Sequence, residues 1–164
     1  MEMDLSKDIP IRMVKPEFLD FVNYNICKAY SEIHGKDEAV GFFRRVGEIG
    51  FEQLRGMVDF PSADPYEVLK AVGGFLEDMG YMSKIQLTKV EEGEVIIEMF
   101  GVSVIDSSIR LTEGGASPSH FMTNLMFAAL KEVSGVHADI YDLTLEQPSA
   151  ETGYGMEKWV LKKI

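Results

Sequence analysis

The sequence has little of the chemistry that marks disulfide-stapled or metal-binding proteins. Its single cysteine, Cys27, cannot form an intrachain disulfide, and its only basic neighbour is Lys28. The three histidines, His34, His120 and His137, are far apart, and none is spaced from another or from the cysteine as metal ligands are. This pattern predicts a buried, unreactive thiol, a reducing compartment such as the cytoplasm, and neither a metal site nor an evident cofactor.

Positive charge and long apolar runs are also scarce. The chain has 16 Lys and Arg against 27 Asp and Glu, a net charge of −11, which repels the phosphate backbone and argues against nucleic-acid binding. No stretch approaches the roughly 20 apolar residues of a membrane span, and the start Met1-Glu2-Met3-Asp4 lacks the basic, then apolar, pattern of a signal peptide. With 164 residues, of which 46% are hydrophobic, we expect one soluble, cytoplasmic domain with its own core.

The first half of the chain has helical periodicity. Apolar residues repeat at helical spacing over residues 16–35, 37–58 and 65–79, after a possible arm or short strand in residues 1–15. Pro16 and Pro65 each suit a first helical position. The second of these helices contains four glycines, which disfavour a helix: Gly41, Gly47, Gly50 and Gly56. Either the backbone approaches a neighbouring helix or a second subunit there, or the helix is bent.

The second half of the chain has mostly the residue pattern of β-strands. Residues 84–88 and 94–100, joined by a turn at 91–94, predict a hairpin, and 102–111, 136–145 and 156–161 are further candidate strands. Between them a fourth helix is expected from Pro118 to Val133, with Ser117 as its N-cap. The order of helices, hairpin, helix and strands predicts an α+β fold, in which helices pack on a mostly antiparallel sheet, formed by one domain over residues 16–164.

The fourth helix has almost no polar face. A helix of this kind must be buried on nearly every side, in the core, in a dimer interface or in the wall of an apolar cavity. Ten methionines favour an adaptable cavity wall, although ordinary core packing also uses methionine. His120 is expected in the first turn of this helix, where the helix dipole disfavours a protonated imidazole. It is either a polar group at the mouth of a pocket or an ordinary surface residue.

From about Phe18 to Ile164 the order of elements resembles the 4-vinyl reductase domain family of hydrocarbon-binding proteins. The parallels are these segments: Gly47-Glu48-Ile49-Gly50, Val68-Leu69-Lys70-Ala71-Val72, Phe75-Leu76, Gly80-Tyr81, Ser119-His120-Phe121 and Glu157-Lys158-Trp159-Val160-Leu161. The resemblance implies the fold of heme–nitric-oxide-binding domains and trafficking-complex subunits, with an apolar pocket between helices and sheet. Many relatives carry cysteine where this chain has Ser119, and residues 139–161 contain none. The Tyr-x-Ser-x-Arg signature of the heme branch is absent.

These observations favour a sensor or carrier that binds a small hydrophobic or amphipathic molecule over an enzyme. The residues expected to line its pocket are Phe43, Phe51, Phe75, Met79, Tyr81, His120, Phe121, Leu125 and Met126. One alternative is an enzyme or accessory that acts on a tetrapyrrole or another hydrophobic substrate, and another is an assembly scaffold with a filled core. Because the second and fourth helices offer more apolar and glycine-rich surface than one small core covers, the sequence also predicts a homodimer.

Overall fold

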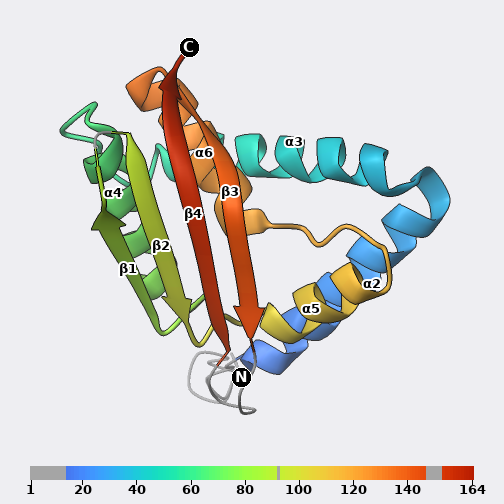
Figure 1. Cartoon of the computed structure of the whole chain (residues 1–164). Coiled ribbons are helices and arrows are strands. Elements are labelled where there is room, and N and C mark those ends of the chain that lie inside the picture. The colour runs from blue at the N-terminus through green and yellow to red at the C-terminus, as the bar shows by residue number, and fades with distance from the viewer. Residues whose placement is uncertain (1–13, 92, 147–152) are drawn as a thin grey trace, which may run out of the picture.

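The computed structural model describes residues 14–91, 93–146 and 153–164 (Figure 1). The proposed N-terminal arm, apart from its last two residues, and Glu92 of the hairpin turn lie outside the described residues. The elements follow in this order: α2 (Pro16–His34), α3 (Lys36–Leu54), α4 (Pro65–Asp78), β1 (Lys84–Lys89), β2 (Glu94–Phe100), α5 (Ile105–Glu113), α6 (Phe121–Ala129), the π-helical turn η1 (Leu130–Ser134), β3 (Val136–Glu146) and β4 (Tyr154–Lys163).

The four strands form one antiparallel sheet in the order β1-β2-β4-β3, which confirms the predicted α+β fold. Successive side chains of a strand point to opposite faces, and on β2 the buried residues are Val95, Ile97 and Met99. This inner face packs against α4 and α6, which lie behind the sheet in Figure 1. Among the described residues, no helix is long and apolar enough to cross a membrane.

Helix α6 is the centre of the core, as its composition predicted. No residue from Phe121 to Leu130 is exposed. Helix α3 crosses α6 closely, because a Cβ added at Gly47 would lie 2.5 Å from backbone and side-chain carbon atoms of Asn124, and one added at Gly50 would lie 3.3 Å from Leu125 and Phe121. The glycines therefore serve an intrachain helix contact at these two positions, whereas Gly41 has open space beside it.

A second, smaller part of the molecule projects from the sheet on the side of β3 (Figure 1). It consists of α2, α5 and the first half of α3, and the buried residues of its core include Cys27, Ala39, Phe43, Leu111 and Ala116. Hydrogen bonds join α2 to α5, since the amide of Asn23 donates to Ser107 Oγ at 2.8 Å and Asp20 accepts from the Ser107 amide at 3.0 Å. This part is therefore held by polar contacts as much as by apolar packing.

The strand expected over residues 102–111 is wrong, because this segment contains α5. Its buried positions are Ile105, Ser107, Ser108 and Leu111, and their spacings of three and four residues place them on one face of a helix. The hydroxyl of Ser108 donates to the carbonyl of Val104, and Arg110 pairs with Asp106 four residues earlier at 3.6 Å. Because residues 102–111 are largely apolar, their sequence suggested a strand and not a helix with these contacts four residues apart.

The fourth helix starts three residues later than predicted. Ser117 does not cap it, because its amide donates to Ser31 Oγ of α2 at 3.1 Å, and Ser119 Oγ donates to Asn23 Oδ1 at 2.8 Å. These contacts with α2 hold the segment extended as far as His120. His120 itself occupies the N-cap position with a left-handed backbone, φ 44°. Tertiary hydrogen bonds thus replaced the local capping that the sequence indicated.

Candidate functional site

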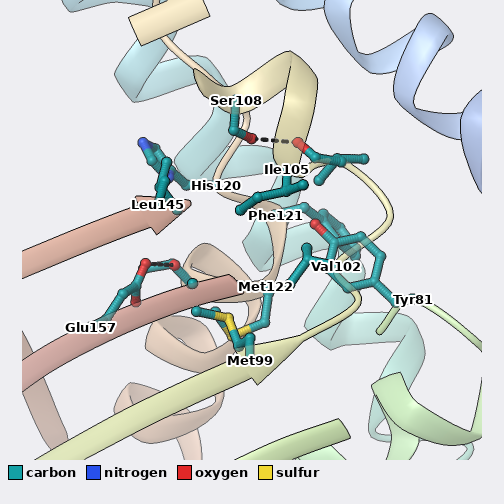
Figure 2. A pocket seen from close by; sticks show the side chains of 13 residues that line it. Tyr81, Met99, Val102, Ile105, Ser108, His120, Phe121, Met122, Leu145 and Glu157 are labelled. Carbon is teal, nitrogen blue, oxygen red and sulfur yellow. Dashed lines mark hydrogen bonds between the residues drawn. The ribbon is translucent and has the colours of Figure 1, made fainter. Parts of the chain in front are cut away.

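A small pocket lies where the start of α6 meets the start of β4, the end of β2 and the first turn of α5. Its volume is about 40 Å³, and Figure 2 shows its lining. The lining residues are Tyr81, Met99, Val102, Val104, Ile105, Ser108, His120, Phe121, Met122, Thr123, Leu145, Gly155 and Glu157. This volume is far below the roughly 300–1,000 Å³ of most small-molecule pockets. A larger guest therefore requires wall residues to move.

A buried carboxyl group, that of Glu157, is the main polar feature of this pocket. Glu157 is 2% exposed, and it lies on the inner face of β4 between Gly155 and Trp159. Thr123 Oγ1 donates to Oε1 at 2.8 Å, and Trp159 Nε1 donates to Oε2 at 2.8 Å. Burial raises the pKa of Glu157, and the two hydrogen bonds only partly oppose this shift.

His120 and Tyr81 add two polar groups to an otherwise apolar lining. Burial lowers the pKa of His120, so the imidazole is favoured in its neutral form. Burial, with a smaller contribution from the charge of Glu157, raises the pKa of Tyr81 above its usual range. In Figure 2 Tyr81 and His120 lie on opposite sides of the pocket, with Phe121 between them. Both titratable groups are therefore favoured neutral, and both can take part in hydrogen bonds without carrying charge.

Flexible side chains form part of the wall. Met99 and Met122 lie next to each other in Figure 2, and both are buried. Gly155 leaves room for Met99, since a Cβ there would lie 3.0 Å from the methionine Cε. Methionine has three rotatable bonds and adapts to irregular shapes. The methionine part of the wall can consequently change shape at lower cost than the part formed by the β-branched Val102, Val104 and Ile105.

The structure brings together three of the nine residues expected to line a pocket: Tyr81, His120 and Phe121. The other six are dispersed. Leu125 and Met126 are fully buried one turn further along α6, where they pack in the main core together with Phe51 and, at its edge, Phe75. Phe43 belongs to the small core around Cys27. Met79 is 69% exposed, because its place just after α4 turns it away from the sheet.

Sequence reasoning missed Glu157, Thr123 and the β-sheet residues of the pocket. A signal for Glu157 existed, because it alternates with Trp159 and Leu161 on one face of a strand, and the register therefore turns a carboxyl inward. No comparable signal marked Thr123, whose role depends on facing Glu157 across 34 residues of chain. Cys27, in contrast, is buried as predicted, and burial raises its pKa to about 11, which makes it a poor nucleophile.

A larger groove of about 560 Å³ lies between α3, α6, η1 and β3. Its charged residues are Arg44, Arg45, Arg55, Lys131, Glu48, Glu52, Glu132 and Asp139, four of each sign. Arg45 pairs with Glu48 at 2.9 Å and with Glu52 at 3.5 Å. The charged side chains of the groove therefore sum to no net charge when His137 is neutral. Within residues 14–91, 93–146 and 153–164, no three His, Cys, Asp or Glu side chains are grouped so that they could hold a metal ion.

Neither the protein-family models nor the curated proteins compared with this sequence produced a match. The resemblance to the 4-vinyl reductase domain family therefore stays a prediction. The chemistry of the pocket itself is the basis for a functional proposal.

Proposed function

We propose that this protein is a sensor or carrier that binds a small apolar molecule with one hydrogen-bond donor in the pocket between α6 and β4. The observation that carries the proposal is the buried carboxyl of Glu157 in an otherwise largely apolar wall. Its two oxygens each accept one bond from the protein, and a carboxylate oxygen has capacity for a second. A donor on the guest can use that capacity.

The buried position of Glu157 destabilises the folded protein, and this cost favours a role for the side chain other than stabilising the fold. Burying a carboxyl carries a desolvation penalty of several kcal/mol for the charged form, and an apolar residue of similar volume often stabilises a core equally well or better. Thr123 and Trp159 offset part of this penalty. A ligand that supplies a further donor offsets more of it, so the site favours such a ligand over a purely apolar one.

The small volume means that the ligand-binding form is a minor conformation of the free protein. Met99 and Met122 can rotate away, and Val102 and Phe121 of the lining are only partly buried. Apparent affinity is reduced by the fraction of molecules that are closed. The resemblance to hydrocarbon-binding domains, which implies an apolar pocket between helices and sheet, supports the same location and is part of this proposal.

Catalysis on a hydrophobic substrate is the second candidate. It is favoured by the opposite pKa shifts of two groups that line one pocket, raised for Glu157 and lowered for His120. Titratable groups whose pKa values are shifted by burial within one pocket are candidates for acid–base roles. Turnover of a vinyl-bearing tetrapyrrole with an added reductant would support this candidate, whereas binding without turnover supports the sensor or carrier.

The test compares three probes with the same five-carbon chain: n-pentanol, its methyl ether and pentanoate. We expect pentanol to raise the melting temperature most, because it alone offers a donor without bringing a second carboxylate beside Glu157. At a hundredfold excess over Kd the gain is about 2.7 kcal/mol, or roughly 5–10 °C for a domain of this size. Differential scanning calorimetry at neutral pH measures it.

A blocking variant separates binding in this pocket from binding elsewhere. Val102→Trp places a large side chain in the pocket lining and should abolish the response to pentanol. Val90→Trp is the matched control, since Val90 is exposed at the end of β1 and lies outside the pocket lining. If the wild type ignores all three probes, the pocket is only a small void in a filled core, and the scaffold alternative is favoured.

A further inference from the structure

The pocket beside Glu157 has a second polar group whose hydrogen-bonding capacity is still open. Three side chains of its lining carry a hydroxyl group: Tyr81, Ser108 and Thr123. Ser108 Oγ donates to the carbonyl of Val104 at 2.8 Å, and Thr123 Oγ1 donates to Glu157 at 2.8 Å. The hydroxyl of Tyr81, in contrast, donates to no atom of the residues that the structure describes. It is therefore the hydroxyl of this lining that a ligand can use as a donor.

The backbone of Tyr81 is fixed from two sides. Gly80, with φ 76°, ends α4 in a Schellman motif, in which the Tyr81 amide donates to the carbonyl of Leu76 at 2.9 Å. The carbonyl of Tyr81 accepts from the amide of Ser103 at 2.9 Å and from its Oγ at 2.7 Å. The helix end and the segment after β2 thus hold the residue in one place.

The ring of Tyr81 is held as well. It packs against Phe121 at the start of α6, with ring centroids 6.2 Å apart and the ring planes tilted by 59°. In Figure 2 the hydroxyl end of Tyr81 lies toward the inside of the pocket. A donor that is already ordered loses little conformational freedom when a ligand binds, which favours its use in recognition.

Tyr81 and Glu157 lie on opposite sides of an apolar stretch of the wall. In Figure 2 the side chains of Met99 and Met122 lie between them. Glu157 offers acceptor oxygens, whereas Tyr81 keeps its proton at neutral pH because burial raises its pKa. The wall therefore presents an acceptor at one side, a donor at the other, and apolar surface between the two.

We propose that Tyr81 is the second polar anchor of this pocket, and that the ligand is a neutral aliphatic molecule with two polar ends, a donor for Glu157 and an acceptor for the Tyr81 hydroxyl. This inference rests on the proposed function and adds the chemical class of the ligand. A ligand that is apolar at the second end leaves the hydroxyl without a partner, which disfavours binding. His120, as a neutral imidazole, offers both a donor and an acceptor, so it selects neither class of end group.

Two probes with the same number of non-hydrogen atoms, hexan-1-ol and pentane-1,5-diol, test this inference. Titrations of the full chain followed by NMR chemical shifts give the dissociation constants. We expect Tyr81→Phe to weaken binding of the diol by about two- to tenfold, the effect of one neutral hydrogen bond, and to leave that of hexan-1-ol unchanged. Tyr141→Phe is the matched control, because it removes a hydroxyl at an exposed position outside the pocket lining.

The hexan-1-ol titration separates this inference from the proposed function. If the wild type binds hexan-1-ol and Val102→Trp blocks it, but Tyr81→Phe changes the two dissociation constants by the same factor, the second anchor is wrong and the pocket stands. An equal effect of Tyr141→Phe and Tyr81→Phe on the diol also overturns the inference. If neither probe binds the wild type, the proposed function fails, and this inference fails with it. Circular dichroism of each variant confirms that the fold is intact.

Discussion

At the scale of single residues, Glu157 makes the stability of this protein depend on pH in an unusual direction. Because its pKa is raised in the folded state, the folded protein holds the carboxyl proton more tightly than the unfolded chain does. This contribution to stability is fully present below the unfolded pKa, about 4.3, and is lost as pH rises through the folded pKa. Most buried carboxylates that are stabilised as anions act in the opposite sense.

Replacing Glu157 by glutamine should remove this dependence. The amide preserves both contacts, since its oxygen accepts from Trp159 and its NH₂ group donates to Thr123, whose hydroxyl also accepts. We therefore expect Glu157→Gln to become more stable relative to the wild type as pH rises from 5 to 8, measured by urea unfolding. The lowered pKa of His120 makes stability change with pH in the opposite direction. Because His120 titrates in both proteins, its effect largely cancels in the difference between their stabilities.

The control for this series is Glu91→Gln, at an exposed site in the hairpin turn. It removes the same charge without altering a buried group, and its stability should follow that of the wild type across the pH range. A Glu157→Gln protein whose stability runs parallel to the wild type would show that the carboxyl does not titrate differently in the folded state. That result would also remove the main physical reason for placing a ligand there.

At the scale of secondary-structure elements, the crossing of α3 and α6 depends on Gly47. An added Cβ would lie 2.5 Å from the backbone carbon of Asn124, and a backbone atom cannot swing aside as a side-chain end can. We expect Gly47→Ala to destabilise the protein by about 1–3 kcal/mol through overpacking. The midpoint of urea unfolding measures the loss, provided that the slope of the transition is unchanged.

The same helix contains its own control. Gly41 has no atom within 4 Å of an added Cβ and lies on the exposed side of α3. Gly41→Ala should therefore raise stability by up to about 1 kcal/mol, as alanine does in a helix that tolerates it. Equal effects of the two substitutions would mean that α3 and α6 do not cross at Gly47.

At the scale of the whole molecule, two hydrophobic cores of very different size contribute unequally to the stability of the fold. Among the residues that the structure describes, the main core between the sheet, α4 and α6 has 17 buried residues, whereas the one between α2, α3 and α5 has five. Local opening free energies follow the amount of buried contact. The part built on α2 and α5 should therefore open before the rest of the protein.

Native-state hydrogen exchange with peptide-level mass spectrometry should show this difference. We expect amides of α2 and α5 to exchange sooner than those of β4 and α6. Uniform protection across all four elements would contradict the two-core description.

The elements whose periodicity is local were predictable from the sequence. Helices opening at Pro16 and Pro65, the β1–β2 hairpin and the burial of α6 all follow from the spacing of apolar residues and from turn or cap chemistry within a few residues. The α+β class follows from their order. Local patterns could predict only part of the candidate site, namely His120 and Phe121 at the start of the apolar helix and Tyr81 after the end of another helix.

What only the tertiary structure decided depends on contacts between residues far apart in the chain. Ser119 bonds Asn23 across 96 residues, which delays the start of α6 and turns His120 toward the pocket. Glu157 meets Thr123 across 34 residues, and this pairing turns an ordinary glutamate into the polar centre of the site. The outward direction of Phe18 and Phe21 on α2 likewise follows from the hydrogen bonds of Asp20 and Asn23 to α5. Local spacing determines which residues share a face, but only long-range contacts determine what that face meets.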